Sequence, residues 1–169
     1  YFNAKKRIFD LLEKSYKKGR YGVVNVDDPY GRELFMMRNS RTYPMASFGI
    51  ETEADYMPDP GAIENSIRGL SYRLARPEAG VDIRLNLLGT FQLYNSLAAL
   101  AVSHRMGVPF EEIAEGLAGL ETVPGRFDVL KADRGFVVIV DYAHTVDALQ
   151  KLLRSVNELE HRRVITVFG

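Results

Sequence analysis

The sequence predicts an α/β fold in which a parallel sheet with helices and a small antiparallel β part is followed by the start of a second, Rossmann-like unit. Segments with a helical hydrophobic period alternate with short apolar runs, which is typical of α/β proteins. Several β-rich runs lie between residues 43 and 88, separated by Pro, Gly and Asp. Pro124 and Gly125 then interrupt the pattern before new strands begin. We therefore expect one unit over residues 1–124 and another over residues 125–169.

The composition favours a cytosolic globular protein. Apolar residues make up 46% of the 169 residues, and the 22 basic residues equal the 22 acidic ones. This charge balance creates no overall field that would attract nucleic acid or an anionic membrane, and no run reaches the roughly 18 apolar residues of a membrane span. The chain has neither Cys nor a signal peptide. Because it starts without Met inside a helical pattern and stops directly after an apolar run, we expect a fragment of a longer protein.

The first segments predict a helix, a strand and a second helix. Residues 1–18 have a helical period that ends before a glycine, and residues 21–26 resemble a buried strand. Asp28 offers an N-cap and Pro29 a first helical residue, while turn chemistry explains the neighbouring Asp27. The apolar stripe of the first helix consists of Ile8, Phe9, Leu12 and Tyr16.

The middle segments predict β structure followed by two helices. Three β-rich runs, at residues 43–50, 66–75 and 81–88, predict a small antiparallel sheet. Helical patterns follow over residues 91–106 and 110–120. After the Pro-Gly break, we expect a final order of strand, strand, helix and strand. The segments concerned are residues 127–133, 136–143, 146–159 and 163–168.

The strongest chemical signal lies where the apolar run 136–140 breaks into polar residues. Asp141 ends this predicted strand, His144 follows three residues later, and Thr145 can cap the next helix. In nucleotide-binding α/β folds, an acidic residue at a strand end accepts hydrogen bonds from ribose hydroxyls. The alternatives are a turn or capping role for Asp141 and an ordinary loop position for His144.

Lys5 is unexpected in the first helix, because it falls within the apolar stripe while the other charged residues point elsewhere. An amine moved toward a core loses hydration, which lowers its pKa and leaves a nucleophilic nitrogen. Carbon dioxide can carbamylate such an amine and so create an anionic metal ligand. The alternative is a lysine whose stem covers apolar surface while its charged end reaches water.

Two amides and one arginine complete the candidates. Gln92 and Asn95 lie three residues apart near a helix start, and carboxamides match the paired donor and acceptor edge of adenine. Arg126 follows the Pro-Gly break, where a guanidinium between two units is suited to bind phosphate. The alternatives are two amides on a solvated face and an ordinary surface arginine.

Six segments occur in an order and spacing that resemble the Mur ligase family, most of all its UDP-N-acetylmuramoyl-tripeptide synthetase type. The resemblance covers essentially the whole chain. It implies the later part of a central ATP-binding domain, then the start of a carboxy-terminal ligase domain, in a monomeric cytoplasmic enzyme of peptidoglycan synthesis. The segments are YFNAK, NVDDP, GTFQLYNSLAAL, VPGRFD, VVIVDYAHTVDAL and the terminal VFG.

The resemblance also implies a reaction and its participants. In this family ATP phosphorylates a carboxylate, and an amine then attacks the acyl phosphate. The implied acid is UDP-N-acetylmuramoyl-L-alanyl-D-glutamate, the amine is meso-diaminopimelate or L-lysine, and the cofactors are ATP and magnesium. Lys5 matches a lysine that is carbamylated and helps to hold magnesium. The implied nucleotide contacts are Gln92 and Asn95 for adenine, Arg126 for the phosphates, Asp141 for ribose and His144 beside it.

The chain departs from the family pattern in several ways. Gln92 stands where Asn is common, and Val146 stands where Pro is common. The chain also lacks a GxxxxGK(S/T) phosphate loop, so we expect residues 1–169 to be inactive alone. Two alternatives stay open: a folylpolyglutamate or cyanophycin synthetase type of ligase, and a non-catalytic binding module with the same fold.

Overall fold

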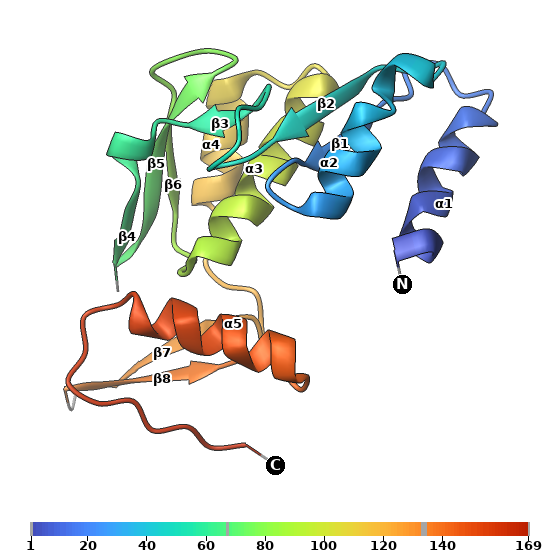
Figure 1. Cartoon of the computed structure of the whole chain (residues 1–169). Helices are drawn as coiled ribbons and strands as arrows, with labels where there is room; N and C mark the ends of the chain where they lie inside the picture. Colours follow the sequence, from blue (N-terminus) through green and yellow to red (C-terminus); the bar gives the residue numbers. More distant parts are fainter. Residues whose placement is uncertain (1, 67, 133–134, 169) are drawn as a thin grey trace.

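The computed structural model of the chain describes residues 2–66, 68–132 and 135–168, and it has the mixed α/β architecture that the sequence predicts (Figure 1). Within these ranges, no helix is both long enough and apolar enough to cross a membrane. Three residues of the expected elements, Tyr1, Ile67 and Asp133, lie outside the described residues, as does Gly169 of the terminal VFG segment.

A pair of parallel strands forms the first sheet. β1 (Gly22–Asn25) pairs in parallel with β2 (Met45–Phe48). The chain between them forms α2 (Pro29–Met36) and a short 3-10 helix, η1 (Arg38–Ser40). The expected antiparallel pairing of residues 43–50 is therefore wrong, because their strand joins β1 through a helical crossover.

The start of α2 confirms the predicted cap. The Asp28 carboxylate accepts hydrogen bonds from the backbone N–H groups of Tyr30 and Gly31. A Cβ atom at Gly31 would lie 1.8 Å from the backbone oxygen of Asn25. Glycine at this position therefore allows α2 to pack closely against the end of β1.

The antiparallel part that the sequence predicts is present. β5 is its central strand and pairs antiparallel with each of the other three. Side chains alternate along β5 between the core and solvent, as expected for a sheet with one covered face. The strands are β3 (Met57–Pro58), β4 (Glu64–Ser66), β5 (Gly69–Arg76) and β6 (Asp82–Leu85), with a 3-10 helix, η2 (Pro60–Ala62), after β3.

The helix α3 (Thr90–Arg105) lies at the centre of the core. It contacts β1, β2 and the following helix, α4 (Phe110–Ala118), and both helices occur where the sequence predicts them. Burying a leucine side chain contributes about 1.5–3 kcal/mol, so this apolar face fixes α3 firmly. Its fully buried side chains include Leu93, Leu97 and Leu100.

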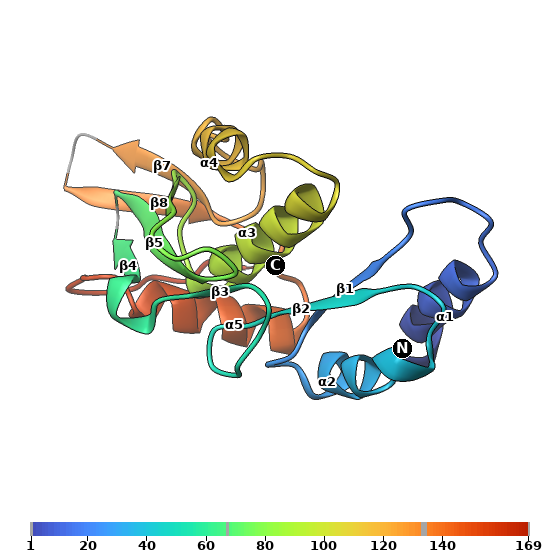
Figure 2. The ribbon, with the colours of Figure 1, turned by 90° about the horizontal axis from the view of Figure 1, so that it is seen from above.

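The last part of the chain contains a hairpin and a helix. β7 (Asp128–Ala132) pairs antiparallel with β8 (Phe136–Val140), and α5 (Val146–Asn157) follows. Thr145 caps α5 by accepting a hydrogen bond from the Ala148 N–H, as the sequence predicts. Figures 1 and 2 show this hairpin and the first helix, α1 (Phe2–Glu13), at opposite ends of the molecule.

Two expected elements differ from the structure. α1 ends at Glu13 rather than at residue 18, because the Tyr16 side chain is 100% exposed and adds no apolar contact that would extend the helix. Residues 163–168 form no strand, although the sequence predicts one. A strand needs a hydrogen-bonding neighbour, and among the described residues β8 pairs with β7 alone.

Candidate functional site

Three segments that carry predicted site residues meet where α3 begins. The Phe127 ring lies 5.7 Å from the Phe91 ring on α3, measured between centroids, and it is 3% exposed. The Phe127 backbone N–H donates to Asp141 Oδ2 at 2.8 Å, and the Tyr142 N–H donates to the Gly125 oxygen at 2.8 Å. These contacts join the start of α3, the corner at residues 125–127 and the end of β8. We call this region the junction.

At Asp141, the turn role and a binding role are compatible. Its Oδ1 accepts a second backbone hydrogen bond, from Ala143 at 2.8 Å, so the carboxylate does form the turn after β8. A carboxylate offers about four acceptor positions, and these two hydrogen bonds leave about two for a ligand. The strand before it is half exposed and antiparallel, rather than part of a buried parallel sheet.

His144 is exposed beside this turn. Its Nδ1 lies 2.9 Å from the Tyr142 carbonyl oxygen, which can only accept a hydrogen bond, so Nδ1 carries a hydrogen. Its ring also meets the Tyr142 ring edge-on, with 5.0 Å between centroids. These contacts fix the ring and leave Nε2 available to a ligand.

The two amides on α3 form one unit. Asn95 Nδ2 donates a hydrogen bond to Gln92 Oε1 at 3.1 Å. Gln92 is 4% exposed, so its expected alternative, an amide on a solvated face, is wrong, whereas Asn95 is exposed. Asn95 therefore keeps one N–H donor and its oxygen acceptor for a ligand, and Gln92 fixes the orientation of that pair.

Arg126 is exposed at the junction, next to the buried Phe127. Its backbone N–H donates to the Val123 oxygen at 2.9 Å, which forms the turn. Its guanidinium has no acceptor among the described residues. The guanidinium donors of Arg126 are therefore available to bind a phosphate at the junction, and their planar arrangement suits phosphate oxygens.

The predicted environment of Lys5 is wrong. Lys5 is exposed, and Ile8 on the supposed apolar stripe is 66% exposed. Of that stripe, Phe9 does pack on the protein, together with Phe2 and Lys6 from outside it. α1 lies at the opposite end of the molecule from the β7–β8 hairpin, so the structure does not bring Lys5 to the junction (Figure 1).

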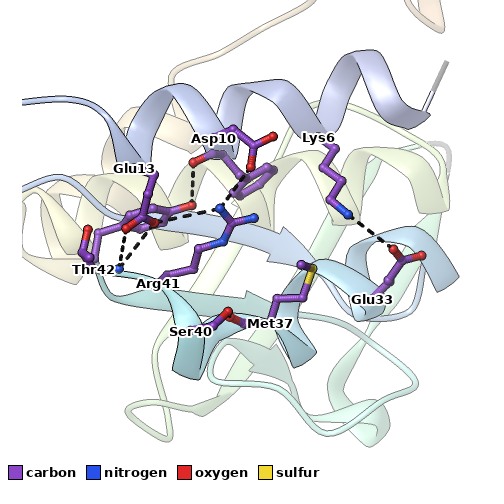
Figure 3. Close-up of polar contacts among 10 residues, drawn as sticks. Lys6, Asp10, Glu13, Glu33, Met37, Ser40, Arg41 and Thr42 are labelled. Carbon is purple, nitrogen blue, oxygen red and sulfur yellow. Dashed lines mark hydrogen bonds and ion pairs between the residues drawn. The ribbon is translucent and has the colours of Figure 1, made fainter.

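Polar contacts help to attach α1 to the rest of the protein, because its packed apolar side chains, Phe2 and Phe9, are only partly buried. The Arg41 side chain, 10% exposed, lies between Asp10 and Glu13, at N···O distances of 3.1 and 3.9 Å (Figure 3). The Thr42 backbone N–H donates to Glu13 at 3.0 Å, and Lys6 pairs with Glu33 at 3.8 Å. Hydrogen bonding from Thr42, aided by the Arg41 charge, holds the pKa of Glu13 below its usual value.

The described residues contain no group of three or more His, Cys, Asp or Glu side chains that could hold a metal ion. Lys5 is a single group, and one ligand does not make a magnesium site. Its carbamylation and its role toward magnesium therefore stay predictions.

One residue of interest was missed from the sequence. Asp27 is assigned to turn chemistry, but its carboxylate accepts hydrogen bonds from the loop after β2 and from Tyr94 on α3. The sequence does contain a feature that could have identified Asp27 as a candidate. Asp27 follows the β1 segment much as Asp141 follows β8, and the criterion that selects one selects the other.

Two family models match the chain. The Mur ligase middle domain matches residues 1–103, and the Mur ligase, glutamate ligase domain matches residues 125–169. Relatives include the UDP-N-acetylmuramoyl-L-alanyl-D-glutamate--2,6-diaminopimelate ligase of Syntrophomonas wolfei subsp. wolfei, 37% identical over 169 residues. The ligase of the same name from Geobacter metallireducens is 39% identical over 171 residues. Both alignments cover 100% of this chain but 33% and 32% of the relatives, so the chain spans about one third of their length.

Solved structures share the fold. MurF from Acinetobacter baumannii has a TM-score of 0.77 at 21% identity, over 92% of this chain and 32% of that chain. Folylpolyglutamate synthase from Thermotoga maritima has a TM-score of 0.61 at 20% identity, over 77% of this chain and 30% of that chain. At these identities the likeness concerns the fold alone.

Proposed function

The chain belongs to the Mur ligase family, and we propose that it forms part of an ATP-dependent ligase of peptidoglycan precursor synthesis. The ligase joins UDP-N-acetylmuramoyl-L-alanyl-D-glutamate to an amino acid through an acyl phosphate. The relatives named above are diaminopimelate ligases, which favours meso-diaminopimelate over L-lysine as the amine. One observation supports the proposal most: the junction joins the segments that carry Asn95, Arg126 and Asp141.

Asn95 contacts the adenine in this proposal. Its free N–H and oxygen match the acceptor and donor that adenine presents side by side. Gln92, buried behind it, orients the Asn95 amide through the hydrogen bond between them instead of contacting the base. This assignment also explains why Gln can replace the Asn that is common at this position of the family.

The other nucleotide contacts come from the corner and the turn of the junction. Asp141 uses its two open acceptor positions for ribose hydroxyls, with His144 beside it. The Arg126 guanidinium binds the phosphates, where its positive charge stabilises the negative charge that develops during phosphoryl transfer. Lys5, as a carbamate, would contribute one ligand to a magnesium ion, which neutralises phosphate charge when bound, but α1 would have to approach the junction for that ion to meet the phosphates at Arg126.

The domain assignment follows from the same proposal. Residues 1–124 form the later part of the central ATP-binding domain, and residues 125–169 begin the carboxy-terminal ligase domain. The enzyme acts as a monomer in the cytoplasm, where ATP and the UDP-linked substrate are available. The folylpolyglutamate alternative is supported by likeness of fold alone.

The test is ligation by the product of the whole gene. The purified protein is given ATP, magnesium, the UDP-linked dipeptide and either diaminopimelate or L-lysine, and both phosphate release and product mass are measured. We expect Asn95→Ala to raise the KM for ATP about tenfold, because losing one or two hydrogen bonds costs about 1–2 kcal/mol. Gln150→Ala, which removes an exposed amide on α5, is the matched control. Ligation of glutamate to a folate, or no ligation at all, would contradict the proposal.

A further inference from the structure

The Asp27 side chain joins three segments of the chain. Its Oδ1 accepts a hydrogen bond from the Thr52 backbone N–H at 2.7 Å. Its Oδ2 accepts from the backbone N–H groups of Ile50 at 2.6 Å and Glu51 at 3.1 Å. The fourth donor is the Tyr94 hydroxyl on α3, which lies 3.0 Å from Oδ2. One carboxylate after β1 therefore fixes both the loop after β2 and the first turns of α3.

These contacts distinguish Asp27 from a ligand-binding aspartate. A carboxylate oxygen offers about two acceptor positions, and three donors already converge on Oδ2 while one reaches Oδ1. Partial burial alone would raise the pKa of Asp27, but the backbone hydrogen bonds hold that pKa below its usual value. Asp27 is therefore an ion at neutral pH whose charge is stabilised by hydrogen bonds from within the protein. It lies at the strand end where α/β proteins bind ligands, yet three donors from within the protein already saturate its Oδ2.

Because Tyr94 lies on α3, its hydrogen bond to Asp27 also affects the neighbouring residues of this helix. Tyr94 lies between Gln92 and Asn95 in the sequence, so all three belong to the first turns of the helix. The Phe91 and Phe127 rings hold the same turns from the junction. A helix moves as a rigid body over such a short distance, so a shift at Tyr94 also shifts the exposed amide of Asn95.

We propose that Asp27 is a positioning residue for the nucleotide site, because through Tyr94 it fixes the orientation in which α3 presents Asn95. The inference rests on the proposed function and deepens it. Asp27 touches neither nucleotide nor substrate. Its negative charge and its place after β1 set the geometry of the adenine contact.

The test compares two variants that each remove one hydroxyl contact to α3. Tyr94→Phe removes the hydrogen bond to Asp27. Tyr21→Phe is the matched control, since the Tyr21 hydroxyl donates to the Val102 oxygen at 2.7 Å, about two helical turns further along α3. Two measurements are made on each variant. They are the kinetic constants of the whole gene product and the NMR signals of the Asn95 and Gln92 side-chain amides in the 169-residue chain.

We expect Tyr94→Phe to raise the KM for ATP about fivefold, with kcat and the KM for the amino acid changed less than twofold. The amide signals of Asn95 and Gln92 shift in this variant and stay in place in Tyr21→Phe. Asp27→Asn has a larger effect than Tyr94→Phe, because the amide nitrogen that replaces one oxygen cannot accept hydrogen bonds.

Two results would overturn the inference. In the first, Tyr94→Phe leaves the KM for ATP and the amide signals unchanged. In the second, Tyr21→Phe changes them equally, which would show a general effect of α3 packing. If the unaltered gene product ligates nothing, the proposed function fails, and the amide signals of the two variants still decide whether Asp27 positions Asn95.

Discussion

The contact between Phe91 and Phe127 carries the geometry of the junction, and its energy can be measured. Phe127 is 3% exposed, and the two ring centroids lie 5.7 Å apart with an interplanar angle of 59°. Truncating a buried Phe to Ala costs about 3–5 kcal/mol in free energy of unfolding. Tilted aromatic pairs at this separation contribute about 0.5–1.5 kcal/mol beyond the burial of their area. We therefore expect Phe127→Ala to lower the free energy of unfolding by about 3–5 kcal/mol. The same substitution should lower it by less in a chain that already carries Phe91→Ala.

A double-mutant cycle isolates the pair. Urea unfolding of Phe91→Ala, Phe127→Ala and the double variant gives the coupling energy, which we expect to be about 0.5–1.5 kcal/mol. The control cycle pairs Phe127→Ala with Phe35→Ala, because Phe35 packs in a separate cluster. The control effects should add to within about 0.5 kcal/mol. A Phe91–Phe127 coupling no larger than that of the control would refute the junction, and with it the nucleotide site.

Three further predictions test other parts of the structure. Arg41→Met should speed amide hydrogen exchange in α1 but not in α4, because α1 has no buried residue and depends on Arg41 for contacts to Asp10 and Glu13; equal protection in wild type and variant would contradict this. Burial raises the pKa of Tyr72 to about 12. Because the folded state keeps Tyr72 protonated to a higher pH than the unfolded state does, the free energy of unfolding is unaffected by Tyr72 below pH 10 and falls as the pH rises toward 12. Tyr72→Phe should remove up to roughly 2–3 kcal/mol of that fall, measured by urea unfolding at several pH values. A pH profile that is the same in wild type and variant would count against this. Residues 1–169 alone should show no ATP-dependent ligation in a phosphate-release assay, and measured ligation by them would overturn this expectation.

The sequence predicts well those features that depend on neighbouring residues. Asp28 caps α2 and Thr145 caps α5, because a cap needs only a side-chain oxygen beside the first free N–H groups of a helix. The order of the longer helices and strands from residue 21 to residue 157 likewise follows from periodicity and from Gly and Pro positions, whereas the short elements η1, β3, η2 and β4 are not predicted. The same local reasoning finds Asn95 and Asp141, whose chemistry is set by their place at a helix start and a strand end.

Lys5 shows where local reasoning stops. A helical stripe predicts the packed side of a helix when apolar contacts decide how that helix docks. Phe9 of that stripe does pack on the protein, but α1 also docks through Arg41, which lies 31 residues beyond Asp10 in the sequence and pairs with polar side chains of the helix. The hydrophobic periodicity of α1 cannot indicate a contact with Arg41, which is so distant in the sequence. The error at residues 163–168 has the same origin, since a strand requires a neighbour that its own sequence does not reveal.

Asp27 and Asp141 pose the same problem more sharply, because the sequence presents them as equivalents. Each follows a β segment of an α/β protein, where a carboxylate can serve a turn or a ligand. The structure separates them by the number of donors that fold back onto each one: four on Asp27 and two on Asp141. The donors to Asp27 belong to segments that lie far away in the sequence, namely the loop after β2 and the Tyr94 hydroxyl. Three donors saturate Oδ2 of Asp27, whereas each oxygen of Asp141 accepts a single hydrogen bond, so counting donors on each oxygen favours a positioning role for Asp27 and a binding role for Asp141.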